Sequence, residues 1–206
     1  TKSVCDMEFI ESFMKFSFSD EDIFRIEEDE LVKDVENVKA CECVVLISEN
    51  VALIEAKSSS PRIENEEKFQ KFISDIGQKF ADSLQLFSDI KSKEKGDEAF
   101  LRLPVNLQNT QIATEAYKIY LIIYGHQLDW LLGLTDALRK ELKNVVTQWN
   151  LRDSNVKVYN EETALENKLI VAYIPKEETK ALRLPDSGID NAKVQAWFAA
   201  HDYQSL

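Results

Sequence analysis

The sequence predicts an α/β protein with a mixed sheet flanked by helices, and three neighbouring segments carry that prediction. Two apolar, β-prone runs over 41–47 and 51–57 are separated by three polar residues, which is typical of a hairpin. A long helix over 64–91 and an almost wholly apolar run over 117–125 come next. A strand, a helical crossover and a second buried strand form a right-handed parallel unit. The hairpin and the parallel pair are therefore expected to share one sheet.

The long helix is predicted from seven apolar residues at helical spacing, which form one continuous apolar face. They are Phe69, Phe72, Ile73, Ile76, Phe80, Leu84 and Phe87. Acidic residues in its first turn favour a helix start near Glu64, because the positive end of the helix dipole lies there.

Further elements follow from the spacing of apolar residues. Met7, Ile10 and Met14 recur at intervals of three and four, which predicts a short amphipathic helix over 6–15. The acidic stretch 20–36 contains β-prone residues and is compatible with a strand whose edges are solvated. The rest of the chain is expected to form a charged loop over 91–98, a helix over 128–149, strands over 156–159 and 169–174, and a helix over 191–201.

The composition predicts one globular domain over residues 1–206. Of these 206 residues, 44% are hydrophobic and 30% are charged, a balance that excludes disordered and collagen-like chains. Five glycines and four prolines are few for a turn-rich all-β sandwich. Three cysteines are an odd number and too few for a disulfide scaffold, so we expect a reducing, cytoplasmic location. No apolar run is long enough to cross a bilayer, so no membrane association is expected.

The hairpin carries the most specific functional signal. A two-residue turn at positions 49–50 puts Glu42 opposite Lys57 and diagonal to Glu55. Side chains alternate between the faces of a strand, so these three polar groups share one face at one end of the hairpin. A one-residue slip would bury them in the apolar core on the opposite face, at a large free-energy cost.

Two carboxylates beside a lysine suit metal-assisted hydrolysis. Carboxylate oxygens are hard ligands that favour Mg²⁺ or Mn²⁺. A metal-bound water can attack a phosphodiester, because the metal lowers the pKa of the water and stabilises the developing charge. A neighbouring lysine can orient or deprotonate that water, or neutralise charge on the phosphate in the transition state.

An acid on one hairpin strand, followed by Glu55-Ala56-Lys57 at the end of the next, resembles the PD-(D/E)XK nuclease superfamily, the fold of many restriction endonucleases. The resemblance implies a restriction-endonuclease-like α-β-β-β-α-β core over about residues 6–125, with 126–206 as decoration. It implies that Glu42, Glu55 and the Ala56 backbone carbonyl bind the metal and that Lys57 positions or activates the water.

The resemblance also assigns roles outside the hairpin. Gln78 and Lys79 on the long helix match a polar helix position that some members use near the active site. An acid from the first predicted helix, Glu8 or Glu11, or Glu27 from the following segment would complete the metal shell. The sequence departs from the family pattern in having glutamate at position 42, where aspartate is usual, and no proline before it.

Other catalytic and metal-binding classes have little support. There are only two histidines, and no glycine-rich phosphate-binding loop is present. Cys41 and Cys43 are separated by one residue, unlike zinc knuckles, so we expect them to be buried hydrophobic residues. His126 follows the buried strand 117–125, where α/β sites often lie, but a lone histidine is more often structural.

The charge balance bears on the partner. The chain has 25 basic and 37 acidic residues, a net charge of −12, and no basic stripe. DNA is the expected partner, bound weakly by this chain alone and aided by local geometry, metal ions or a partner protein. The wide apolar faces of the helices over 128–149 and 191–201 are expected either in the core or in a homodimer interface.

Three alternatives to a nuclease remain open. The chain could be a non-catalytic protein-interaction module on a nuclease fold, such as a defence or genome-maintenance subunit. A basic cleft around Lys57 and Lys79 would count against that reading. The acidic stretch 20–36 could instead engage a basic partner or mimic DNA. Finally, Glu42, Glu55 and Lys57 could form a purely structural buried ion network.

Overall fold

The centre of the fold is a five-stranded mixed sheet in the order β3-β4-β5-β6-β7. The computed structural model describes residues 5–33, 38–111, 116–186 and 188–201. The strands are β3 (Ile23–Phe24), β4 (Cys43–Ile47), β5 (Asn50–Lys57), β6 (Tyr117–Ile123) and β7 (Val156–Tyr159). The β3–β4 and β4–β5 pairs are antiparallel, whereas the β5–β6 and β6–β7 pairs are parallel. The predicted α/β class with a mixed sheet flanked by helices is therefore confirmed.

A second, antiparallel sheet has the order β1-β2-β8, with strands β1 (Asp6–Glu11), β2 (Met14–Ser19) and β8 (Ala172–Tyr173). The prediction of a helix over 6–15 was wrong. Ser12 and Phe13 both have positive φ and turn the chain between β1 and β2. Phe16 is fully buried and stacks on Phe9, whereas Met7 is 37% exposed. Packing at a period of two across the hairpin therefore outweighs the accidental helical spacing of the apolar residues.

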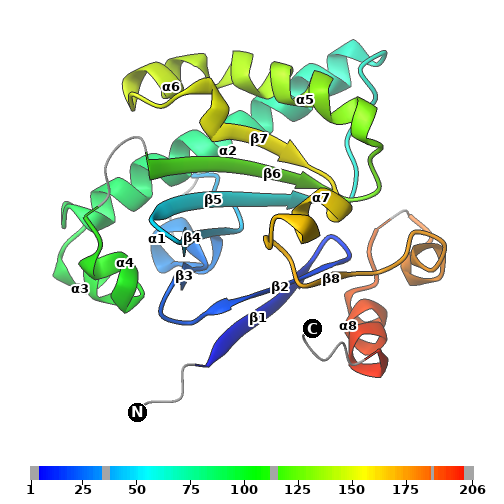
Figure 1. Ribbon diagram of the computed structural model, residues 1–206, viewed down its shortest axis with the longest axis horizontal. Coiled ribbons are helices and arrows are strands. Elements are labelled where there is room, and N and C mark those ends of the chain that lie inside the picture. The colour runs from blue at the N-terminus through cyan, green and yellow to red at the C-terminus, as the bar shows by residue number, and fades with distance from the viewer. Residues whose placement is uncertain (1–4, 34–37, 112–115, 187, 202–206) are drawn as a thin grey trace.

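Helices cover one face of the central sheet, as Figure 1 shows. Helix α2 (Glu66–Lys91) packs on β5, and its predicted apolar face lies in the core, with only Phe72 partly exposed. Helix α5 (Leu128–Glu141) packs on β7 and α2, and the short α6 (Lys143–Gln148) follows it. The predicted single helix over 128–149 is thus two helices, which meet at the buried Leu142.

The other face of the central sheet is covered by the β1-β2-β8 sheet and by helix α8 (Asn191–Ala200), with α7 (Glu161–Glu166) beside the end of β7. This second apolar cluster combines N-terminal residues such as Phe13 with C-terminal residues such as Trp197. Segments beyond residue 125 therefore belong to both sheets and to both cores. Among the described residues, no helix has the length and apolar character that a membrane crossing requires.

The acidic stretch 20–36 contributes only the two-residue strand β3, then helices η1 (Ile26–Glu28) and α1 (Glu30–Lys33); positions 34–36 lie outside the described residues. Buried Asp29 accepts two hydrogen bonds from Arg102, at 2.9 and 3.0 Å. This contact ties α3 (Asp97–Arg102) to the acidic stretch. The remaining short helices are α4 (Val105–Asn109), η3 (Asp153–Asn155) and η4 (Thr179–Leu182).

Candidate active site

The pairing of β4 with β5 differs from the predicted register by two residues. Its last pair is Ile47 with Asn50, so the two-residue turn is Ser48-Glu49 and not residues 49–50. The other end of the ladder pairs Cys43 with Ile54. Continuing this register one step places Glu42 opposite Glu55, where the prediction put Lys57. A shift of two residues keeps every side chain on its predicted face, so hydrophobic patterning alone could not distinguish the two registers.

The two carboxylates are buried. Glu42 is 4% exposed and Glu55 is fully buried. The Oε2 atom of each accepts no hydrogen bond from any described residue. A buried carboxylate oxygen without a partner is costly, because it has lost its hydration without replacement. Glu55 lies in β5 and Glu42 directly precedes β4, so the two unsatisfied oxygens lie at the same end of the hairpin.

The other oxygen of Glu55 is held by two lysines. Lys79 Nζ, from α2, donates a hydrogen bond to Glu55 Oε1 at 2.7 Å, and Lys57 forms an ion pair with the same oxygen. Burial alone lowers the pKa of Lys79, but attraction to Glu55 outweighs it, so the pKa is raised above its ordinary value. Lys79 therefore carries a full positive charge beside the carboxylate at neutral pH.

The surroundings of Glu42 are acidic. Burial, contact with Glu27, and the negative charges of Glu55 and Glu11 raise the pKa of Glu42 to about 9. Arg25 partly offsets this charge: it binds Glu27 at 2.6 Å and lies 4.0 Å from Glu42 Oε2. A bound cation would oppose this shift and favour the ionised form of Glu42.

Of the two remaining predicted site residues, Ala56 lies near the carboxylates and Gln78 does not contact them. Ala56 lies in β5 beyond Ile54, the last residue that pairs with β4, which keeps it at the end of the hairpin where the carboxylates lie. Gln78 is exposed on α2, and its side-chain amide donates to Asp82 at 2.6 Å, so it is engaged outside the cluster.

The three acids expected to complete the metal shell, Glu8, Glu11 and Glu27, lie in different surroundings. Glu27 and Glu11 both influence Glu42 electrostatically. Glu8 instead forms an ion pair with Lys15 at 2.9 Å and is about half exposed. Glu27 is thus the candidate that the contacts bring nearest to the predicted pair, through its shared contact with Glu42 and Arg25.

The site offers a divalent cation two carboxylate side chains. In the described ranges, no group of three or more His, Cys, Asp or Glu side chains is arranged to hold a metal ion. Glu42 and Glu55 nevertheless supply two unsatisfied carboxylate oxygens at the same end of the hairpin. Mg²⁺ is commonly bound by one or two carboxylates and keeps several waters, so the pair matches Mg²⁺ or Mn²⁺ better than Zn²⁺.

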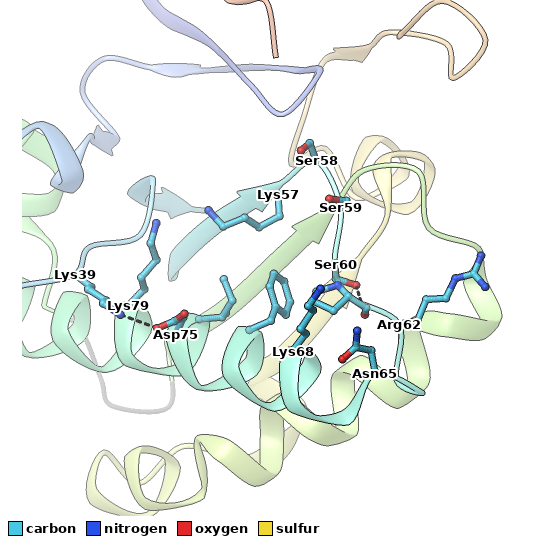
Figure 2. A pocket seen from close by; sticks show the side chains of 13 residues that line it. Lys39, Lys57, Ser58, Ser59, Ser60, Arg62, Asn65, Lys68, Asp75 and Lys79 are labelled. Atoms are coloured by element: carbon cyan, nitrogen blue, oxygen red, sulfur yellow. Dashed lines mark hydrogen bonds and ion pairs between the residues drawn. The ribbon is translucent and has the colours of Figure 1, made fainter. Parts of the chain in front are cut away.

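A basic cleft of about 960 Å³ lies beside the lysines (Figure 2). Its charged lining consists of five basic side chains and one acidic side chain: Lys39, Lys57, Arg62, Lys68, Lys79 and Asp75. The hydroxyl residues Ser58, Ser59 and Ser60 form the loop after β5 that borders it. Arg62 and Lys68 form no ion pair with any described residue, so their charges are available to an anionic ligand.

Sequence reasoning missed most of this cleft. Lys39, Arg62 and Lys68 come from separate segments, so no basic run marks them in the sequence. The available signal was their position, because Arg62 and Lys68 follow closely after the carboxyl end of a parallel strand, where α/β folds bind ligands. Arg25 was also missed, since it lies far from Glu42 in the chain and is brought to it only by the pairing of β3 with β4.

Searches against protein-family models, curated proteins and solved structures found no match for this chain.

Proposed function

We propose that the protein is a metal-dependent nuclease of the PD-(D/E)XK type that hydrolyses phosphodiester bonds of nucleic acid. One observation carries the proposal: a buried carboxylate pair with two unsatisfied oxygens lies behind Lys57 and Lys79, which themselves line a basic cleft. The chain as a whole carries a net charge of −12, so five basic residues in one cleft are a local reversal of sign. Such a reversal favours an anionic ligand.

The arrangement of elements supports the family resemblance in part. The β4–β5 hairpin, the α2 crossover and the parallel strand β6 correspond to the β-β-α-β portion of the proposed core. The first part departs from it, because β1 and β2 form a hairpin where the resemblance implies a helix, and α1 follows β3.

Each side chain has a distinct role in the proposed reaction. Arg62 and Lys68 bind phosphates of the strand in the cleft. Lys57 orients the attacking water, and Lys79 holds the Glu55 carboxylate in place. Glu42, Glu55 and the Ala56 carbonyl would hold Mg²⁺ or Mn²⁺, which when bound supplies an acidified water and compensates charge on the phosphate.

The decisive experiment combines metal binding with cleavage. We expect Mn²⁺ titration by calorimetry to detect binding to the wild type, and supercoiled plasmid or labelled oligonucleotides to be cut in Mg²⁺ or Mn²⁺. Glu55→Gln should lose both binding and cleavage while retaining its circular dichroism spectrum, because the change removes a charge and preserves the shape. Glu94→Gln, at an exposed position in a distant turn, is the matched control. A wild type that binds no metal at millimolar concentration would refute the nuclease proposal.

A second candidate is the non-catalytic interaction module. It is favoured by the two lysines on one oxygen of Glu55, which can be read as a closed buried ion network. In that case neither metal nor nucleic acid would bind the wild type, and Glu55→Gln would change neither measurement. The same calorimetric and cleavage measurements therefore separate the two candidates.

A further inference from the structure

A second, smaller pocket adjoins the basic cleft around the loop that follows β5. It has a volume of about 120 Å³, and Ser60, Pro61 and Arg62 line both cavities. Its lining also includes Phe69 of α2, Trp130 of α5 and the acidic residue Glu64. A strand with phosphates on Arg62 would therefore pass the mouth of a pocket that contains two aromatic side chains, Phe69 and Trp130.

The shape of this pocket depends on a close packing contact. Ile63, from the same loop, rests against Gly133 of α5, where a β-carbon would come within 2.8 Å of the Ile63 Cδ1 atom. Glycine at this position therefore lets the loop approach the helix. Trp130 is 44% exposed although it lines the pocket, so part of its indole surface is available to a ligand.

Two polar side chains of the pocket lining, His126 and Ser60, contact each other. His126 Nε2 and Ser60 Oγ are 2.7 Å apart, and the His126 ring meets the Trp130 ring edge to face at 5.5 Å. Asn160 fixes the backbone there by donating to the His126 carbonyl at 2.9 Å. Burial lowers the pKa of His126, and its ring is held in place by Ser60 and by a hydrogen bond with the backbone of Tyr124.

We propose that this pocket holds one unstacked nucleobase, stacked on Trp130, of a strand whose phosphates lie in the basic cleft. This inference rests on the proposed nuclease function and names its substrate more narrowly: a single strand, or a duplex from which one nucleotide is flipped out. At about 120 Å³ the pocket is well below the roughly 300 Å³ at which pockets for drug-sized ligands begin, so it suits one ring system. Aromatic stacking, with polar groups at the ring edge, is the usual way in which proteins hold unpaired bases.

The test measures oligonucleotide binding by fluorescence anisotropy in EDTA, so that no cleavage occurs. The probes are a labelled single-stranded nonamer of deoxythymidine and the same nonamer with abasic sites throughout. We expect the wild type to bind the intact probe at least 10-fold more tightly than the abasic one, a value within the range measured for base–aromatic stacking. Trp130→Ala should bind both probes equally weakly, and Trp130→Phe should restore most of the preference.

Matched variants separate the possible failures. Leu132→Ala removes an apolar side chain that is 69% exposed on the same helix and does not line the pocket, so it should leave the preference unchanged. If intact and abasic probes bind equally while Lys68→Glu weakens both, the base pocket is refuted and the nuclease proposal stands. If the wild type binds neither probe and cuts no nucleic acid in Mn²⁺, both proposals fail. If Trp130→Ala changes only the oligomeric state, the surface is a protein contact and the base pocket is refuted.

Discussion

Two lysines contact the same oxygen of Glu55, but they come from different elements and should be separable by mutation. Lys57 is the more exposed of the two and lines the basic cleft from the strand end. We expect Lys57→Met to lower the cleavage rate by about 10²- to 10⁴-fold, the range for a group that assists proton transfer. Calorimetry should detect Mn²⁺ binding at least as tight as in the wild type, because one competing cation is removed. Loss of metal binding in this variant would contradict the role assigned to Lys57.

The ion pair between buried Asp29 and exposed Arg102 predicts how stability depends on pH. Burial alone would raise the pKa of Asp29, but hydrogen bonds from Arg102 and from the Leu31 N–H outweigh it, so the pKa lies below 3.8. A carboxyl group with a lower pKa in the folded state stabilises the protein above its unfolded pKa and loses that contribution as the pH falls. We expect Asp29→Asn to lower the free energy of unfolding at pH 7 by about 1–3 kcal/mol.

Urea denaturation at two pH values checks this expectation. The difference between wild type and Asp29→Asn should be smaller at pH 3 than at pH 7. Glu30→Gln, at an exposed neighbouring position, should differ little from the wild type at either pH. A difference of equal size at both pH values would mean that the Asp29 charge contributes nothing.

At the scale of the element, the β4–β5 turn offers a test of register. Ser48 has a φ of 57°, in the left-handed region, whereas Glu49 is outside it. Glycine adopts positive φ without a steric penalty, so we expect Ser48→Gly to raise the free energy of unfolding by about 0.5–1 kcal/mol. Glu49→Gly should lower it, because it only adds flexibility to the unfolded chain. Urea denaturation of both variants measures the difference, and the reverse order would favour the register predicted from the sequence.

Some helices and strands could be predicted from the sequence and others could not, for physical reasons. Long periodic segments such as 64–91 and 117–125 were predicted correctly, since many residues agree on one face. The segment 6–15 was not, because three apolar residues fit both a helix and a hairpin, and only packing against distant residues decides. The faces of Glu42 and Glu55 could be predicted from alternation, whereas their alignment depends on the turn and remains ambiguous by two residues.

For the whole molecule, the reversal of charge in the cleft predicts the salt dependence of binding. Each phosphate that a cation neutralises adds about −0.7 to the slope of log K against log salt for single strands, and about −0.9 for duplexes. We expect Lys68→Gln to reduce the magnitude of that slope by about one such increment. Lys71→Gln, also on α2 but outside the cleft, should leave the slope unchanged. Equal slopes for wild type and Lys68→Gln would show that Lys68 does not contact a phosphate of the nucleic acid.

The β1-β2-β8 sheet joins segments that are far apart in the sequence, and this has a consequence for biosynthesis. β1 and β2 are synthesised before β8, but their sheet and the apolar cluster behind it need β8 and residues such as Ile174 and Trp197. The hairpin with Glu42 and Glu55, α2 and β6 can all be made before that second cluster is covered. Termination of translation before β8 would release a chain with the Glu42–Glu55 hairpin complete and the second apolar cluster uncovered. Such a fragment would be a substrate for chaperones and proteases.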